Sequence, residues 1–232
     1  MKILSIIPAC AESHGIPNKN IRIIGDHPLV YYSIRNALNS KYITDVVVST
    51  DSPEVKIIAQ QMGVKVHWRD EALCSDAVTL DAVIYDGIPN EEKWDYIVTM
   101  QPTSPTLHVE TLDAAIQYTI SNNLDTVISA INAPQLSWGI KDGKKVPNYK
   151  ERLNRQYMPP CYVETGAFLI SKGSVISSQT RIGEKIEVFE TSQTESINVD
   201  TFYDLRTVES VMSSNKVAIY VNGNNKRGIG HI

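Results

Sequence analysis

The stretch Asp45–His67, DVVVSTDSPEVKIIAQQMGVKVH, decides the fold. Its valine-rich start, Asp45–Ser49, is typical of a buried strand. The pair Ser52-Pro53 opens a helix and Gly63 closes it, because serine favours a helix cap, proline the first turn and glycine the position after the last turn. Val64–His67 is a second short strand. This order predicts a βαβ unit with parallel strands.

The same alternation continues on both sides of this stretch, which predicts an α/β fold with a mostly parallel, Rossmann-like sheet. The expected strands are Lys2–Pro8, Tyr96–Met100, Thr126–Ala130, Thr165–Ser171 and Lys185–Glu190. The expected helices are Leu29–Leu38, Thr79–Gly87, Val109–Ser121 and Asp204–Ser213.

Composition excludes several classes of partner. The chain has 232 residues, 42% of them hydrophobic, with 22 Lys+Arg against 26 Asp+Glu and a net charge of −4. This length suits one large domain, or a main domain with a small appendage. An isoelectric point near 5.7 without a basic cluster argues against binding to a nucleic-acid polymer. No apolar run reaches the roughly 20 residues that span a bilayer, so we expect no membrane partner.

The N-terminus and the cysteines indicate a cytoplasmic protein. Met1–Ile7 can be mistaken for a signal peptide, and Pro8-Ala9-Cys10 for a lipoprotein cleavage site. The apolar stretch is shorter than the roughly 7–15 residues of a signal peptide core, and a buried strand fits better. Cys10, Cys74 and Cys161 are an odd number without a CxxC pair, which favours neither a disulfide framework nor a zinc site.

The segment Asn132–Pro160 interrupts the pattern. It has few apolar residues, no clear period and several prolines. We expect an excursion from the sheet that serves as a lid, a dimerisation arm or both.

Ligands of open α/β sheets bind beyond the carboxyl ends of the strands, and two early loops follow such ends. In Pro8–Asn20, PACAESHGIPNKN, small residues can turn backbone N–H groups toward a phosphate and Lys19 can add a charge. It is neither a Walker loop nor a GxGxxG motif, and an ordinary connecting loop is an equal alternative. Ser49–Ser52 is read more simply as a helix N-cap.

Two later loops also carry polar side chains. In Gln101–Pro105, QPTSP, two prolines stiffen a loop with three polar side chains, which favours a binding site over a turn and a cap. In Ile197–Thr201, INVDT, Asp200 could hold magnesium beside a nucleotide phosphate. The alternative for Asp200 is a simple N-cap.

In their joint order, these segments resemble the CMP-sialic acid synthetase (acylneuraminate cytidylyltransferase) family from Lys2 to about Ser213. The matching segments are GIPNKNI at Gly15–Ile21, VVVSTDS at Val46–Ser52, WRDEALCSD at Trp68–Asp76, QPTSP at Gln101–Pro105, RQYMPP at Arg155–Pro160, ETGAFLI at Glu164–Ile170, and INVDT followed by Asp204-Leu205.

The resemblance implies a nucleotide-diphospho-sugar transferase type of fold over residues 1–215, with residues 132–163 as the dimerisation arm of a homodimer. It also implies an Mg²⁺-dependent enzyme. This enzyme would transfer CMP from CTP to the anomeric hydroxyl of an acidic nine-carbon 2-keto sugar, a nonulosonic acid, and release pyrophosphate.

The resemblance also assigns roles to individual residues. Lys19 and Asp200 would be catalytic, and Asp200 with Asn198 would bind the metal. The nucleotide would contact Ala9, Cys10, Ala11, Ser13, Asn20, Arg69 and Ser75. The sugar would contact Gln101, Thr103, Ser104, Arg155, Glu164 and Thr165.

Several residues depart from the family pattern. Cys10 and His14 replace an arginine and a lysine of the usual PARxGSKG loop, Glu12 adds an anion, and Asn198 replaces a metal-binding aspartate. Two cations are thus missing from a triphosphate site. The alternative function is therefore a catalytically impaired nucleotide- or sugar-binding module. A third hypothesis, an eight-carbon acceptor, is less favoured because enzymes of that type lack QPTSP.

The tail Lys216–Ile232, KVAIYVNGNNKRGIGHI, lies beyond the resemblance. We expect a strand at Lys216–Val221 followed by a glycine-rich turn. This pattern resembles the start of a GT-B-type nucleotide-sugar hydrolase or glycosyltransferase domain. Residues 216–232 would then begin a second domain, with Asn222–Ile232 loosely held.

Overall fold

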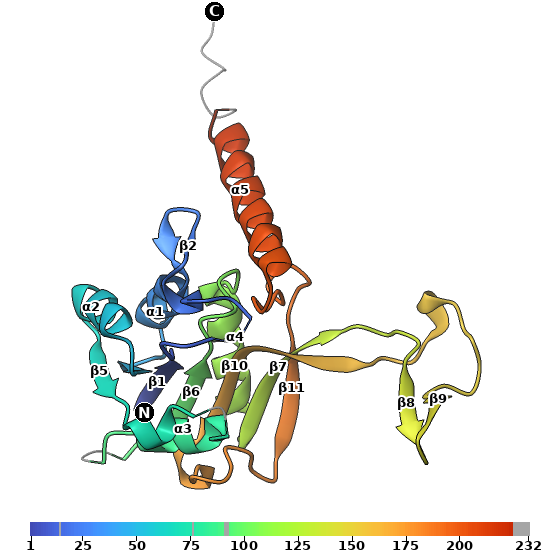
Figure 1. The fold of residues 1–232 in the computed structure, drawn as a ribbon, viewed down its shortest axis with the longest axis horizontal. Coiled ribbons are helices and arrows are strands. Elements are labelled where there is room, and N and C mark those ends of the chain that lie inside the picture. Colours follow the sequence, from blue (N-terminus) through green and yellow to red (C-terminus); the bar gives the residue numbers. More distant parts are fainter. Residues whose placement is uncertain (14, 76, 91–92, 225–232) are drawn as a thin grey trace, which may run out of the picture.

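A seven-stranded sheet in the order β11-β7-β10-β6-β1-β4-β5 forms the centre of the molecule (Figure 1). The computed structural model describes residues 1–224 apart from 14, 76 and 91–92, with side chains as far as Ser213. The strands of the sheet are β1 Ile3–Pro8, β4 Asp45–Thr50, β5 Lys65–Trp68, β6 Tyr96–Met100, β7 Thr126–Asn132, β10 Tyr162–Lys172 and β11 Ile186–Glu190.

The predicted α/β class with a mostly parallel sheet is confirmed. Strand β1 pairs in parallel with β4 and β6, β4 with β5, and β7 with β11. Strand β10 runs antiparallel to both of its neighbours, β6 and β7. Its register shifts between Glu164 and Leu169, where Gly166 has a φ of 72°. An apolar run does not encode strand direction, so the sequence did not predict this reversal.

Helices cover both faces of the sheet. Helices α1, α2 and α4 pack on one face, and α3 packs on the other through Ile84 against Leu4 and Ile6. Burial of each such side chain contributes about 1.5–3 kcal/mol. The helices are α1 Leu29–Asn39, α2 Pro53–Gln61, α3 Leu80–Asp86, α4 Val109–Ser121 and α5 Phe202–Asn224, with short turns η1 Lys19–Ile21, η2 Glu71–Leu73, η3 Arg155–Tyr157 and η4 Gly173–Val175.

The stretch Asp45–His67 forms the predicted βαβ unit as β4, α2 and β5. Ser52 caps α2, because its side chain accepts a hydrogen bond from the Val55 N–H at 3.2 Å. Gly63 follows the helix with a φ of 76°, a conformation that glycine adopts without strain. The N-cap interpretation of this loop is therefore confirmed.

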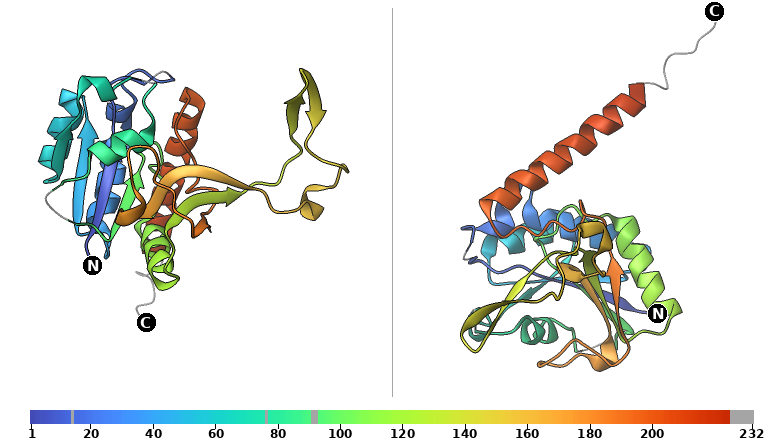
Figure 2. Two further views of the ribbon diagram at one scale, coloured as in Figure 1. Left: turned by 90° about the horizontal axis from the view of Figure 1, so that it is seen from below. Right: turned by 90° about the vertical axis from the view of Figure 1, so that its right-hand side faces the viewer.

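The chain leaves the sheet between β7 and β10, as expected for Asn132–Pro160, and forms an arm (Figure 1). Strands β8 Trp138–Lys141 and β9 Lys144–Pro147 pair as an antiparallel hairpin on this arm. Asp142 and Gly143 join them with φ values of 51° and 73°, which suits a two-residue hairpin turn. Figure 2 shows the hairpin standing well away from the sheet.

The strand expected at Lys216–Val221 is wrong, because these residues belong to α5. This helix contains no proline, and its first glycine is Gly223. Extending an existing helix through β-branched residues costs only a few tenths of a kcal/mol each, whereas a new strand needs a pairing neighbour. The expected glycine-rich turn lies outside the described residues, and the second domain stays a prediction.

A second small sheet joins the N-terminal half to α5. Strands β2 Ile23–Ile24 and β3 His27–Pro28 pair antiparallel, and Ile24 packs in a cluster with Leu205 and Val208 of α5. None of the helices in the described part of the chain combines the length and hydropathy that a bilayer crossing requires.

Candidate active site

A cleft of 520 Å³ lies at the carboxyl ends of the parallel strands. The first, third and fourth candidate loops and the segment after β5 all contribute to its wall. The sequence-predicted site residues that line it are Cys10, Ser13, Lys19, Asn20, Arg69, Ser75, Gln101, Thr103 and Asp200. Residues far apart in the chain thus meet in one place, as expected for this edge of an α/β sheet.

Lys19 lies where the first and fourth loops meet. Its Nζ donates hydrogen bonds to the Val199 carbonyl and to Asp200 Oδ1, both at 3.0 Å. The Lys19 side chain is 14% exposed and that of Asp200 is 61% exposed. Gly15 passes so close that a Cβ there would lie 2.2 Å from the Asp200 carbonyl oxygen. Only glycine allows this approach of the two loops.

Hydrogen bonds within and behind the first loop fix its shape. The buried Asn20 donates from Nδ2 to the Cys10 carbonyl at 2.8 Å. The Cys10 thiol donates to the Glu12 carbonyl at 2.8 Å. Behind the loop, Asp51 Oδ1 accepts from the Ala11 N–H at 2.8 Å. The loop is therefore held by its own backbone and by the end of β4.

The cations missing from the first loop leave a sparse set of positive charges. The Cys10 thiol turns back onto its own loop, and Glu12 adds a carboxylate to the cleft wall. Among the described lining residues, the cations are Lys19 and Arg69. His14 lies outside the described residues.

Arg69 is fixed at the end of β4. It is 5% exposed, and its Nη2 donates to the Ser49 carbonyl at 2.9 Å. Ser75 and Cys74 follow on the same wall. Burial raises the pKa of the Cys74 thiol, and the nearby Asp51 carboxylate raises it further, so this thiol stays protonated and a poor nucleophile at neutral pH.

The third and fourth loops are joined directly. The Val199 N–H donates to the Thr103 carbonyl at 2.8 Å. The hydroxyl groups of Thr103 and Ser104 are buried without a hydrogen-bond partner. Thr103 lines the cleft, although its hydroxyl oxygen itself is buried. Ser104 is buried and is not among the residues that line the cleft.

Asp200 is not the N-cap of α5. Thr201 takes that place, because its Oγ1 accepts from the Asp204 N–H at 3.3 Å while Asp204 Oδ2 accepts from the Thr201 N–H at 2.7 Å. This reciprocal pair is a capping box. The exposed Asp200 carboxylate is therefore left to face the cleft.

The Asp200 carboxylate suits magnesium shared with a phosphate. No group of three or more His, Cys, Asp or Glu side chains that could hold a metal occurs among the described residues. Asn198 donates from Nδ2 to Asp200 Oδ2 at 2.5 Å, and its Oδ1 is buried without a partner. Magnesium is commonly bound through one or two carboxylates plus substrate phosphates, so the chemistry of the Asp200 carboxylate fits it. Asn198 is not among the residues that line the cleft, and its amide nitrogen, not its oxygen, faces Asp200.

Other predicted contacts lie away from this cleft. Ala9 is fully buried, and Ala11 faces a separate small cavity. Thr165 is buried and donates to Ser129 Oγ at 2.8 Å. Glu164 lines a side cavity that shares Gln101 with the cleft.

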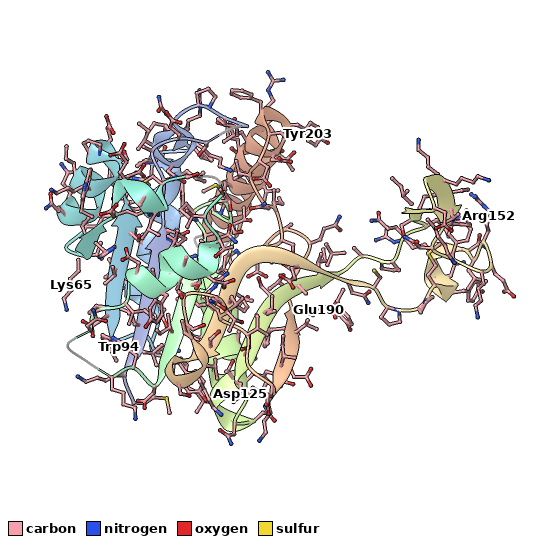
Figure 3. All side chains as sticks on the ribbon, turned by 60° about the horizontal axis from the view of Figure 1, so that its bottom comes forward. Lys65, Trp94, Asp125, Arg152, Glu190 and Tyr203 are labelled. Atoms are coloured by element: carbon pink, nitrogen blue, oxygen red, sulfur yellow. The ribbon has the colours of Figure 1, made fainter. Side chains whose placement is uncertain are left out.

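Arg155 lies on the arm, outside the cleft of its own chain. It forms the start of η3 and is exposed. Figure 3 shows the nearby Arg152 at the end of the arm, far from the labelled residues of the sheet. Arg155 could reach a sugar only if the arm met another copy or moved.

Part of the cleft wall was not expected from the sequence. Val78, Leu80 and Val83 supply an apolar surface from the start of α3. Leu80 and Val83 have the spacing of an ordinary helix face and Val78 comes just before the helix, so no sequence pattern marked these residues as part of a site. Cys74 belongs to the quoted segment WRDEALCSD but was not assigned a role.

The chain is similar to known proteins in sequence and in fold. A family model described as "Cytidylyltransferase" matches residues 4–138. CMP-N,N'-diacetyllegionaminic acid synthase of Legionella pneumophila is 28% identical over 237 residues, covering 94% of this chain and 100% of the relative. Pseudaminic acid cytidylyltransferase of Campylobacter jejuni is 31% identical over 179 residues, covering 72% of this chain and 77% of the relative.

Among solved structures, a CMP:2-keto-3-deoxy-manno-octonic acid synthetase complexed with CTP has the same fold. Its TM-score is 0.72 at 16% identity, and the match covers 93% of this chain and 100% of that one.

Proposed function

Because this chain belongs to the cytidylyltransferase family, we propose that it transfers CMP from CTP to the anomeric hydroxyl of an acidic nine-carbon 2-keto sugar. The relatives named for legionaminic and pseudaminic acids support this class of acceptor. The observation that carries the proposal is the ion pair of Lys19 and Asp200 in the wall of a cleft large enough for a nucleotide.

The reaction forms one bond and breaks another at the α-phosphorus of CTP. The sugar hydroxyl oxygen attacks this phosphorus, the bond to the β-phosphate breaks, pyrophosphate leaves and the hydroxyl proton is released. Such transfers depend mainly on positioning and on charge stabilisation. Lys19, oriented by Val199 and Asp200, would stabilise the charge that develops on the phosphates.

Asp200, with Asn198, would hold Mg²⁺ at this site. When bound, the ion neutralises phosphate charge and makes the sugar hydroxyl easier to deprotonate. Arg69 and Ser75 would contact the base, and Gln101 and Thr103 would contact the sugar.

The arm supports a homodimer as part of the same proposal. Its exposed apolar side chains and the exposed Arg155 would meet the second copy. Cys10, Cys74 and Cys161 are free thiols, which fits the reducing cytoplasm.

A second candidate function is a nucleotide- or sugar-binding module without catalysis. The replacement of two expected cations by Cys10 and His14, and of a carboxylate by Asn198, favours it.

Pyrophosphate release from CTP distinguishes the two functions. The assay uses the full chain with Mg²⁺ and a panel of nonulosonic acids, with the eight-carbon acid for comparison. We expect turnover with at least one nine-carbon acid. CTP binding without turnover on every sugar would favour the binding module instead.

A further inference from the structure

Helix α4 begins without a capping side chain of its own. Its N-cap residue is His108, whose side chain makes no capping hydrogen bond. The His108 N–H instead donates to Oε1 of Glu195 at 3.1 Å, from a residue 87 positions further along the chain. In a capping box this acceptor is a glutamate or glutamine three residues into the helix, which here is Thr111. Glu195 thus takes the place of a local cap.

The Glu195 carboxylate is buried and ionised. Its side chain is 7% exposed, and Ser192 Oγ donates to Oε2 at 2.7 Å. Burial acts to raise the pKa of this carboxyl, but hydrogen bonds from the Thr111 and Ser192 side chains and from the His108 N–H outweigh it. The pKa therefore lies below its ordinary value of 4.5. A helix N-terminus also favours a negative charge, so the carboxylate is a fixed point of the structure.

Glu195 ties two of the candidate loops together where they leave the body of the fold. The third loop, Gln101–Pro105, runs on to His108 at the start of α4. The fourth loop, Ile197–Thr201, begins two residues after Glu195. The bond from the His108 N–H to Glu195 therefore joins the end of one loop to the beginning of the other.

A second tie joins the same two loops within the active site. The Val199 N–H donates to the Thr103 carbonyl at 2.8 Å, and the Val199 carbonyl accepts from Lys19 Nζ at 3.0 Å. The Val199 side chain is fully buried. With Glu195 fixed four residues earlier, Val199 has little freedom to move, and Lys19 is oriented through it.

We propose that Glu195 is a positioning residue, whose carboxylate holds the third and fourth loops together and so keeps Val199 and Lys19 in place for the reaction. Glu195 is not among the described residues that line the cleft, so it acts through the loops and not on the substrate. The inference rests on the proposed function, because it assigns Lys19 a part in the transfer. A shift of about 1 Å at a group that takes part in a reaction can cost up to about 10²-fold in rate.

Glu195→Ala tests the proposal by kinetics. We expect kcat for pyrophosphate release to fall roughly tenfold or more, because Lys19 is no longer held in place. The KM for CTP should change little, because Arg69 and Ser75, which would contact the base, lie in parts of the wall that Glu195 does not touch. The control is Glu190→Ala, at an exposed position at the end of β11. A wild-type kcat in the Glu195 variant would overturn the proposal.

Two further measurements separate positioning from a loss of folded protein. Glu195→Gln keeps an acceptor oxygen for the His108 N–H, and we expect it to recover most of the lost kcat. Titration calorimetry should show that Glu195→Ala still binds one CTP per chain. A CTP stoichiometry that falls in parallel with kcat would mean that only folded protein is lost, and would overturn the proposal.

Hydrogen exchange tests the tie without turnover. In Glu195→Ala without ligands, we expect the Val199 amide to exchange roughly tenfold faster, because the fourth loop opens more often. The Ala9 amide, bonded to the Ser49 carbonyl on the other side of the cleft, should keep its wild-type rate. Faster Val199 exchange in a chain whose wild type releases no pyrophosphate would support the tie and contradict the proposed reaction. Wild-type turnover, with kcat and Val199 exchange both unchanged in the variant, would leave the reaction standing and overturn the tie.

Discussion

Lys19 is the residue on which the proposed chemistry depends most. Removing a preorganised charge that stabilises the transition state costs about 10²–10³-fold in kcat. We therefore expect Lys19→Met to lower the rate of pyrophosphate release by that factor at saturating CTP and sugar. The control is Lys65→Met, at a surface ion pair with Asp45. Wild-type kcat in the Lys19 variant would remove this residue from the mechanism.

Asn198 is the residue that tests the metal hypothesis. Asn198→Asp adds a second carboxylate beside Asp200, and charged oxygens bind magnesium more tightly than an amide oxygen. We expect the Mg²⁺ concentration for half-maximal activity to fall roughly tenfold. Asn39→Asp, at an exposed position on α1, is the control. An unchanged Mg²⁺ requirement would contradict a metal role for this loop.

Capping at the start of α5 couples the stability of this element to pH. Partial burial of the Asp204 carboxyl acts to raise its pKa, but hydrogen bonds from the Thr201 side chain and from the N–H groups of Asp200 and Thr201 outweigh it. The pKa of Asp204 therefore lies below its ordinary value of 3.8. The folded state therefore binds the proton of Asp204 less well than the unfolded state does. The stability that the ionised Asp204 contributes is present above the ordinary pKa of the carboxyl, and it is lost as the pH falls from that pKa toward the lower pKa of the folded state.

We expect Asp204→Ala to lower the free energy of unfolding by about 1 kcal/mol at pH 7, because it removes the carboxylate of the first helical turn and its hydrogen bonds. The difference from wild type should shrink as the pH falls below the ordinary pKa of the carboxyl. Urea denaturation at neutral and acid pH measures both effects, with the exposed Glu209→Gln on the same helix as control. A difference independent of pH would mean that the carboxylate charge contributes nothing.

The elements also show where sequence patterns fail. The hairpin of the arm was not predicted, because its segment shows no clear apolar period, although Asp142-Gly143 is a pair typical of a two-residue hairpin turn. Strand β10 was recognised but its direction was not, because pairing direction depends on neighbours elsewhere in the chain. The end of α5 was misread because a β-branched run has only a weak preference against a helix.

At the scale of the whole molecule, the meeting of the loops at one site could be predicted, because a parallel sheet brings the carboxyl ends of its strands to the same edge. By this rule the loops of Lys19 and Asp200 were expected to meet. In the structure Lys19 is hydrogen-bonded to Val199 and to Asp200, which lie 180 and 181 positions further along the chain. The side cavity could not be predicted in the same way. Arg181 reaches it from a loop with no motif, through contacts with Asp81 and Thr99 that only the folded chain creates.

The arm is the part of the molecule through which we expect two copies of the chain to form a dimer. A two-stranded hairpin is marginal in water by itself, yet this one exposes Trp138 at 58% and Ile140 at 79%. Tyr157 on the same arm is 70% exposed. Apolar side chains gathered on a projecting element are typical of an interaction surface. Two copies related by a two-fold axis could cover both arms at once.

We expect sedimentation to show a dimer of the wild-type chain and a shift toward monomer in Ile140→Asp. Activity should fall with dimer dissociation, because Arg155 would then no longer reach the cleft of the second copy. The control is Ile57→Asp, at an isoleucine 54% exposed on α2. A monomeric wild-type chain with full activity would contradict the dimer. A dimer that survives the arm variant would place the interface on another face and leave Arg155 without a route to the sugar.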